Sequence, residues 1–289
     1  MALPDILTSP SIMKPLKITS WNIARRERAW RTIVESDSDI ALLQEANEPP
    51  PDIAENLNIN PGSWQTNGGS DRRWRTVILQ LSDRVDIEWL EPRSLIDAKP
   101  GEFAVSQPGT LAAALVAPSA GKPFTVVSMY ALWEHLIGKA TKGWIYADAS
   151  AHRLISDLSG LVNRQQGQRI VAAGDLNSLY GYGEKGNKYW ADRYATIFDR
   201  MSALGLPFVG PQSPEGRLAD PWPDELPLTS KNVPTYHTNH QTPTTATRQL
   251  DFVFASRDLI PNISVKALND PADWGPSDHC RIETTIACD

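Results

Sequence analysis

Ile170–Asn177, which reads Ile-Val-Ala-Ala-Gly-Asp-Leu-Asn, joins four apolar residues to a polar segment. The apolar residues predict a short buried strand, and Gly174 allows the backbone to turn where that strand ends. Asp175 and Asn177 follow at the carboxyl end, where α/β sheets place their ligand clefts. On an extended segment, side chains two residues apart lie on the same face. The carboxylate could then bind a water while the amide beside it donates a hydrogen bond to an anion. The alternative is a turn in which they only cap the next segment.

Length and charge limit the kinds of protein that this chain can be. The chain has 289 residues, 41% of them hydrophobic, and no low-complexity linker. We therefore expect a flexible leader over residues 1–15 and one α/β domain over residues 16–289. The 28 basic and 34 acidic residues give a net charge of −6. A broad basic face is thereby excluded, and phosphate binding must be local or assisted by a metal.

Cysteine content and hydropathy bear on location. On one strand, Cys280 and Cys288 would lie roughly 26 Å apart, which is too far for a disulfide. Few cysteines and no signal-like N-terminus predict an intracellular, cytoplasmic protein. The most apolar run, Leu111–Ala117, is much shorter than the roughly 20 residues that a membrane span needs.

Three other strand-like runs also end on a polar residue. The pairs are Leu16–Trp21 with Asn22, Asp39–Gln44 with Glu45, and Phe124–Met129 with Tyr130. Successive strands that release polar groups at one edge of a sheet assemble a site there. Glu45 alone is equally compatible with capping a helix over Pro49–Leu57. The Tyr130 hydroxyl could donate to a phosphate oxygen, and the ordinary alternative is a buried tyrosine with one bond to the backbone.

The remaining patterns predict a mixed sheet crossed by helices. Helical spacing is found around Ala29–Val34, over Ala149–Arg164 and over Trp190–Leu204. Further strands are expected at Trp74–Leu81, Val85–Leu90, Leu111–Ala117, Gln249–Ala255, Ile263–Leu268 and Arg281–Ala287. The helix before Ile170 makes a crossover between parallel strands, and the hairpin-like runs before it favour antiparallel pairs.

A proline-rich excursion spans Pro207–Arg248 and predicts a long irregular binding surface. It contains His237 and His240, a pair that fits zinc only weakly because no further ligand follows at a suitable spacing. Ordinary loop histidines are the favoured interpretation. Beyond it, Asp251 lies on a strand, and Ser277-Asp278-His279 precedes the final one.

Set in chain order, the polar groups at strand ends are Trp21-Asn22, Gln44-Glu45, Tyr130, Gly174-Asp175-Leu176-Asn177, Leu250-Asp251 and Ser277-Asp278-His279. Together they resemble the endonuclease/exonuclease/phosphatase family, which has the deoxyribonuclease I-like fold. Each motif alone has low specificity, but six in this order cover nearly the whole chain. The resemblance implies a four-layer α/β sandwich, with two mixed β-sheets packed face to face, helices outside, and a catalytic cleft along one edge.

The resemblance also implies a metal site. Glu45 would be the main ligand, with Asn22 beside it and Asp278 contributing directly or through water. Oxygen donors of this kind suit Mg²⁺ or Mn²⁺.

For catalysis, the resemblance implies that Asp175 orients or deprotonates the attacking water. Asn177 and Tyr130 would donate to the phosphate oxygens, and His279 would donate from the opposite side. Asp251 would hold the imidazole ring. Whether Asp175 or His279 is the base stays open.

The expected activity is metal-dependent hydrolysis of phosphodiester bonds in DNA or RNA, by an endonuclease or an exonuclease. The alternative is a phosphatase or phosphodiesterase acting on a small molecule or a phospholipid head group, which suits an acidic chain. Abasic-site repair is in doubt, because Glu45 is followed by Ala46-Asn47 where those enzymes have Thr-Lys. A binding module without catalysis is disfavoured, because every catalytic position is filled.

We expect a monomer that contacts a nucleic acid through few side chains. The candidate cations are Arg25, Arg26, Arg72, Arg73 and Arg75. Candidates for base stacking, against a role in core packing, are Trp133, Trp144, Trp190, Trp222 and Trp274.

Overall fold

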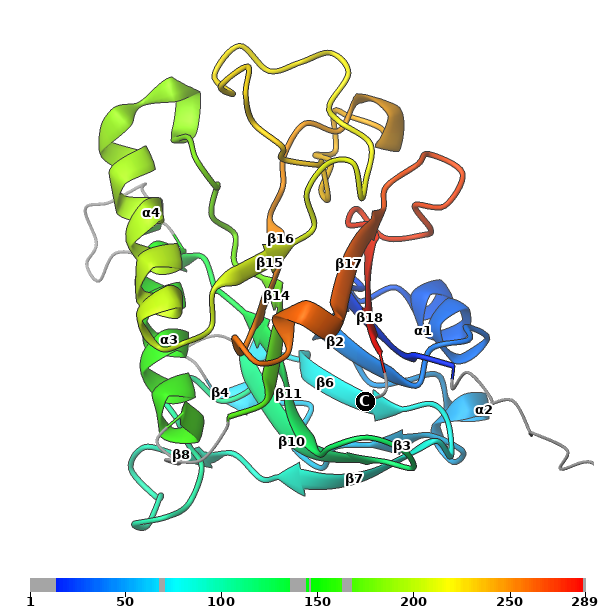
Figure 1. The fold of residues 1–289 in the computed structure, drawn as a ribbon. Coiled ribbons are helices and arrows are strands. Elements are labelled where there is room, and N and C mark those ends of the chain that lie inside the picture. The colour runs from blue at the N-terminus through cyan, green and yellow to red at the C-terminus, as the bar shows by residue number, and fades with distance from the viewer. Residues whose placement is uncertain (1–13, 68–70, 136–143, 146, 163–167, 288–289) are drawn as a thin grey trace, which may run out of the picture.

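The computed structural model describes residues 14–67, 71–135, 144–145, 147–162 and 168–287. Most of the predicted leader, as well as Cys288, lies outside the described residues. Two six-stranded sheets pack face to face, and helices cover their outer surfaces (Figure 1). The predicted four-layer α/β sandwich is therefore confirmed.

The first sheet has the order β17-β18-β1-β2-β6-β3. Its strands are β17 (Ile263–Leu268), β18 (Arg281–Ile286), β1 (Leu16–Asn22), β2 (Ile40–Ala46), β6 (Arg75–Gln80) and β3 (Asn58–Ile59). Strands β1 and β2 are parallel and the other pairs are antiparallel. The carboxyl ends of β1 and β2 therefore lie at the same edge, where Asn22 and Glu45 are found.

The second sheet has the order β15-β16-β14-β11-β10-β7. Its strands are β15 (Phe208–Gly210), β16 (Asp251–Ala255), β14 (Ile170–Asp175), β11 (Phe124–Tyr130), β10 (Leu111–Pro118) and β7 (Val85–Leu90). Strands β11 and β14 are parallel, with Tyr130 opposite Asp175, and Asp175 is opposite Asp251 of antiparallel β16. Three predicted site residues thus share one row across this sheet.

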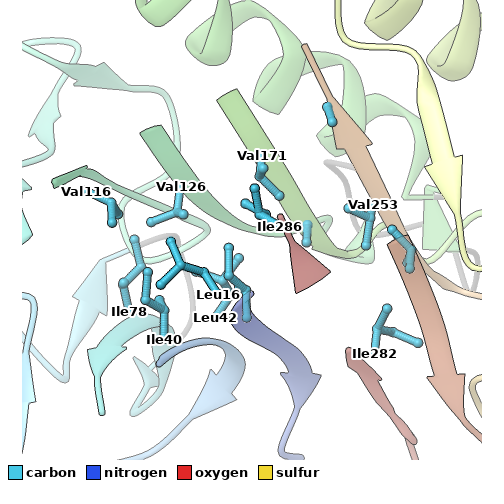
Figure 2. Close-up of a cluster of buried hydrophobic side chains, with 14 of the residues drawn as sticks. Leu16, Ile40, Leu42, Ile78, Val116, Val126, Val171, Val253, Ile282 and Ile286 are labelled. Atoms are coloured by element: carbon cyan, nitrogen blue, oxygen red, sulfur yellow. The ribbon is translucent and has the colours of Figure 1, made fainter. Parts of the chain in front are cut away.

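Alternation along the strands divides the apolar residues between the layers. In β2, Ile40 and Leu42 join the cluster between the sheets, whereas Ala41 and Leu43 face the outer helices. The cluster between the sheets draws residues from both of them, and Figure 2 labels Leu16, Ile40, Leu42, Ile78, Val116, Val126, Val171, Val253, Ile282 and Ile286. Each buried Leu, Ile or Val stabilises the fold by about 1.5–3 kcal/mol relative to exposure.

Helices form the outer layers. The first sheet is covered by α1 (Glu27–Val34), whose Trp30 and Ile33 are fully buried, and by short α2 (Pro51–Ala54). The second sheet is covered by α3 (Asp148–Val162) and α4 (Lys188–Ala203). No helix among the described residues is both long enough and apolar enough to cross a membrane.

Several predicted boundaries were wrong. Helix α4 begins two residues before Trp190, because the Asn187 side chain accepts a hydrogen bond from the Tyr189 backbone and caps the helix. The helix predicted over Pro49–Leu57 is a single turn. The apolar spacing around Ala29–Val34 also predicts a buried Val34, which is wrong because Val34 is 36% exposed. The excursion after Pro207 is not wholly irregular, because it opens with the edge strand β15.

Short two-stranded pairs were not predicted, because two residues carry no periodic pattern. They are β4 (Thr66–Asn67) with β5 (Asp71–Arg72), β8 (Arg93–Ser94) with β9 (Ala104–Val105), and β12 (Glu134–His135) with β13 (Trp144–Ile145).

Gly174 brings β14 close to β11. It has φ +153°, and a Cβ there would lie 1.9 Å from the Met129 carbonyl oxygen. We expect Gly174→Ala to lower the free energy of unfolding by at least about 3 kcal/mol, because the strands must separate. Gly160→Ala in α3 is the control, since its Cβ would meet nothing within 4 Å. Urea denaturation measures both, and equal stability of the two variants would contradict the prediction.

Candidate active site

Glu45 is turned out of its strand by a bulge. The register between β2 and β6 shifts between Leu43 and Ala46, and Glu45 has φ +46°. Bulges of this kind re-aim a side chain beside a functional site. The Glu45 side chain is 17% exposed, and its Oε2 lies 3.5 Å from Nε of Arg25.

Asn22 joins residues of the two sheets. Its Nδ2 donates to Oδ2 of Asp175 at 2.9 Å and lies 3.4 Å from both Oε1 of Glu45 and Nε2 of His279. Its Oδ1 accepts a hydrogen bond from the Ala24 backbone. The four side chains predicted from four separate motifs are therefore brought together, with the Asn22 amide at their centre.

Asp175 is the last residue of strand β14, whereas Asn177 lies beyond the strand and is not extended. Oδ1 of Asp175 accepts a 2.8 Å hydrogen bond from the backbone N–H of Asn177, and Asn177 has φ +46°. The prediction that both side chains share a face of one extended segment was wrong, because the Asn177 backbone is left-handed. The Asn177 amide instead donates to the Ala131 carbonyl at 2.9 Å. One of its two N–H groups is therefore already engaged.

His279 and Asp251 form a buried pair. Nδ1 of the ring lies 2.8 Å from Oδ2 of Asp251, and Nε2 lies 3.7 Å from Oδ2 of Asp175. Thr235 donates to the same oxygen of Asp251 at 2.6 Å, and its hydroxyl accepts the N–H groups of Leu250 and Asp251. The imidazole ring thus contacts Asp251, and Thr235 contacts the same carboxylate oxygen.

Burial and charge set the protonation of this cluster. Burial raises the pKa of Asp175 to about 7, against the opposing charge of His279. Burial also disfavours a charged His279, but the charges of Asp251 and Asp175 outweigh it and raise the pKa of His279 to about 10. In the metal-free protein at neutral pH, the ring is therefore a cation between two carboxyl groups.

Tyr130 lies beside Glu45. Its hydroxyl donates to Oε1 of Glu45 at 2.9 Å, and its ring meets Trp74 edge-on at 5.0 Å between centroids. Burial, together with the charges of Glu45 and Asp175, raises the pKa of Tyr130 well above its usual range. The single hydroxyl hydrogen is given to Glu45, so donation to a phosphate requires this bond to exchange.

The donors fit a hard cation that takes few protein ligands. Among the described residues, no three His, Cys, Asp or Glu side chains are grouped to enclose an ion. Mg²⁺ usually binds through one or two carboxylates and keeps several waters. Glu45, partly exposed and with a single cation near Oε2, matches this pattern. Asp278 is half-buried and accepts a 3.3 Å bond from Ser277.

The predicted cations are not equally available. Arg75 is buried, lies over the Trp64 ring and donates to the Asn60 and Pro61 carbonyls. Arg72 is also buried, over Trp74. The prediction that both contact the substrate was wrong, because each side chain is buried with its guanidinium over an aromatic ring. Exposed cations from the predicted set are Arg25, Arg26 and Arg73.

The tryptophans divide in the same way. Trp274 is 1% exposed and belongs to the core, which removes it as a stacking residue. Trp133 is 36% exposed, and Trp190 and Trp222 are half-buried. The Trp144 side chain lies outside the described residues.

Three residues near the site have contacts that the sequence did not predict. Thr235 and Tyr236 lie in the proline-rich excursion, where no periodic pattern marks them. The Tyr236 ring contacts the His279 ring at a tilt of 45° with centroids 4.8 Å apart, and the Tyr236 backbone bridges to Arg248 and His279. Gln44 donates to Ser128 at 3.0 Å across the two sheets. The position of Gln44 at the end of a predicted strand, next to Glu45, could have indicated this contact. A buried side-chain amide needs a hydrogen-bond partner.

We expect Asp251→Asn to reduce kcat by roughly 100-fold or more while changing KM little, because the ring loses its orientation and its compensating charge. In the metal-free variant, the pKa of His279 should fall from about 10, because a raising charge is removed. Histidine NMR titration measures this shift.

Combining Asp251→Asn with His279→Gln tests whether the two residues act as a pair. The double variant should lose little more activity than His279→Gln alone. His152→Gln, on α3, is the matched control and should keep wild-type kcat. Fully multiplicative losses would show that the pair does not act together.

No protein-family model and no curated protein matches the sequence. Solved structures do match it over nearly its whole length. The catalytic domain of APE2 from Xenopus laevis aligns with a TM-score of 0.63 and 17% identity, over 94% of this chain and 92% of that one. An AP endonuclease from Archaeoglobus fulgidus gives 0.57 and 17%, over 94% and 99%. The 3' phosphatase NExo from Neisseria, bound to a product DNA hairpin, gives 0.54 and 16%, over 94% and 99%. Likeness at this identity concerns the fold, and the chain has the deoxyribonuclease I-like fold of the endonuclease/exonuclease/phosphatase proteins that its strand-end motifs resemble.

Proposed function

We propose that this chain is a divalent-metal-dependent nuclease that hydrolyses phosphodiester bonds in DNA or RNA. The observation that carries the proposal is the contact of Asn22 with Asp175, Glu45 and His279 at one edge of the sandwich. This cluster supplies a proton acceptor, hydrogen-bond donors and a carboxylate that fits a cation. Structural neighbours named as an AP endonuclease and as a DNA-bound 3' phosphatase support phosphoester chemistry.

Glu45 would hold the metal, with Asn22 and Asp278 as further ligands, and Mg²⁺ or Mn²⁺ suits these oxygen donors. When bound, the ion would offset negative charge on the phosphate and on the leaving oxygen.

The protein's own groups would then act on the water and the phosphate. Asp175 would take the proton of the attacking water, its oxygens oriented by the Asn22 amide and the Asn177 N–H. His279, held by Asp251 through Nδ1, would donate from Nε2 to a phosphate oxygen as charge develops. Tyr130 and the second N–H of Asn177 would donate alongside it. With His279 acting as a hydrogen-bond donor, Asp175 is favoured over His279 as the general base.

A substrate screen tests the proposal. Supercoiled plasmid, single-stranded DNA, RNA and phosphate monoesters are incubated with Mg²⁺, with Mn²⁺ or with a chelator. We expect nucleic-acid cleavage that the chelator stops and that added metal restores. Turnover of monoesters or head groups without any nucleic-acid cleavage would contradict the nuclease proposal.

The alternative, a phosphatase or phosphodiesterase on a small ester, is favoured by the net charge of −6 and by the burial of Arg72 and Arg75. Salt dependence separates the two. A polynucleotide held by a few exposed arginines should bind an inactive Asp175→Asn variant with a shallow salt slope, equal to a few released ions. No oligonucleotide binding at low salt would favour the alternative.

A further inference from the structure

Two polar side chains meet between the sheets, directly behind the catalytic cluster. Gln44 of β2 and Ser128 of β11 belong to opposite sheets, and both are fully buried. Leu42 and Val126, which precede them by two residues, belong to the apolar cluster between the sheets, where Figure 2 labels both. Side chains alternate along a strand, so Gln44 and Ser128 face the same interior. A polar contact thus replaces apolar packing at this level of the core.

The Gln44 amide joins the two sheets. Its Nε2 donates to the Leu42 carbonyl at 2.9 Å and to Oγ of Ser128 at 3.0 Å. The Ser128 hydroxyl donates in turn to the Leu43 carbonyl at 3.0 Å. Leu43 is the residue at which the register between β2 and β6 begins to shift. The amide and the hydroxyl therefore hold the base of the bulge.

The bulge decides the direction of the Glu45 side chain. In regular alternation, Gln44 would face the space between the sheets and Glu45 would face the helices, as Leu43 does. Instead, Glu45 has φ +46° and accepts the Tyr130 hydroxyl from the other sheet at 2.9 Å. Ser128 and Tyr130 are two residues apart on β11, so the two strands are joined by two successive links. A shift of the inner link therefore moves the outer one.

The Gln44 amide does not suit the core for the sake of stability. Among the described residues, its buried Oε1 has no hydrogen-bond donor. A buried acceptor without a donor destabilises the folded protein, and an apolar side chain of the same shape avoids this cost. Stability alone would therefore favour an apolar residue at this position, and functional sites are where proteins give up such stability.

We propose that Gln44 is a positioning residue, whose amide fixes the bulge and thereby the place of Glu45 beside Tyr130. This inference rests on the proposed nuclease function. On the other side of the bulge, the carbonyls of Gln44 and Glu45 each accept a backbone N–H of the loop after β1 at 3.0 Å. The amide thus supplies the remaining support, from the facing sheet. It acts through Glu45, where a misplacement of about 1 Å can lower a rate by about 100-fold.

Gln44→Met tests the proposal, because methionine keeps the length and the packing of the side chain but donates no hydrogen bond. We expect kcat for nucleic-acid cleavage to fall about 30-fold and Mn²⁺ to bind the substrate-free variant about 10-fold more weakly, since support of a metal ligand is lost. KM should change less than about 2-fold, because no substrate contact is removed. The midpoint of urea denaturation should stay equal or rise, because Oε1 is removed. A merely structural amide predicts the reverse, a lower midpoint with unchanged kcat.

Gln80→Met is the matched control in the same sheet. Gln80 is opposite Ile40 at the far end of β2, and its amide donates to the carbonyls of Ser82 and Val85. This variant should unfold at a lower urea concentration, because it loses satisfied hydrogen bonds, and it should keep wild-type kcat and Mn²⁺ affinity.

Ser128→Ala gives a second, independent measurement. It leaves the Gln44 amide without its acceptor, so both kcat and the urea midpoint should fall. Adding Gln44→Met to this variant should raise the midpoint again while lowering kcat little further, because the two residues act as one link.

An active wild-type nuclease for which the kcat of Gln44→Met stays within about 3-fold would overturn the inference alone. A Gln44→Met protein that unfolds at lower urea than Gln80→Met would do the same, since the amide would then serve stability. A wild-type protein that cleaves no nucleic acid and binds no Mn²⁺ would overturn the inference together with the proposed function.

Discussion

Asp175→Asn should lower kcat for phosphodiester hydrolysis by about 1,000-fold, within the range that general-base catalysis supplies. An amide of nearly the same shape cannot accept the proton of the water. It can still accept the Asn177 N–H through its oxygen, but its nitrogen then faces the Asn22 amide, which is also a donor. The variant should therefore fold, with a modest loss of stability from the lost hydrogen bond.

Asp157→Asn is the control for this substitution. Asp157 is another buried carboxylate. It lies on α3, accepts hydrogen bonds from Ser106, and is remote from the strand ends that form the site. It should lose stability while keeping most of its kcat, which single-turnover rates at saturating metal will measure. A kcat for Asp175→Asn within about 10-fold of wild type would remove Asp175 as the base.

The sequence predicted those parts of the fold that repeat. In β2 and β14, alternate side chains lie between the sheets, and the others face the helices. This period of two follows from the strand geometry, so it can be predicted from the sequence. The convergence of strand ends was predictable for the same reason, because parallel β1 and β2 must release Asn22 and Glu45 at one edge. Six such motifs in order then identified the fold.

Other features of the fold and the site depend on single contacts that no repeating sequence pattern predicts. The bulge that turns Glu45 outward leaves no signal in the sequence Gln-Glu-Ala, since any residue can occupy either side of the register shift. Thr235 lies in an irregular excursion and donates a hydrogen bond to Asp251, and no repeating pattern in the sequence marks this contact. Arg75 was predicted to contact the substrate, but its side chain is buried and its guanidinium lies over the Trp64 ring. Irregular backbone and side-chain packing thus explain most of the errors.

Glu45→Gln should abolish metal-dependent hydrolysis, with a loss of at least about 1,000-fold, because a metal ligand of this kind supplies several kcal/mol to the transition state. The amide keeps an oxygen that can accept the Tyr130 hydroxyl, so the bulge and the neighbouring ring need not move. What is lost is the negative charge that opposes Arg25 and that a cation requires. Unlike Asp175→Asn, this variant should also bind Mn²⁺ more weakly, which calorimetry on the substrate-free protein measures directly. Glu91→Gln, which removes an exposed carboxylate paired with Arg93, should bind Mn²⁺ like the wild type. If Glu45→Gln instead binds Mn²⁺ normally and loses only kcat, then Glu45 positions Tyr130 and Asn22 and the metal is held elsewhere.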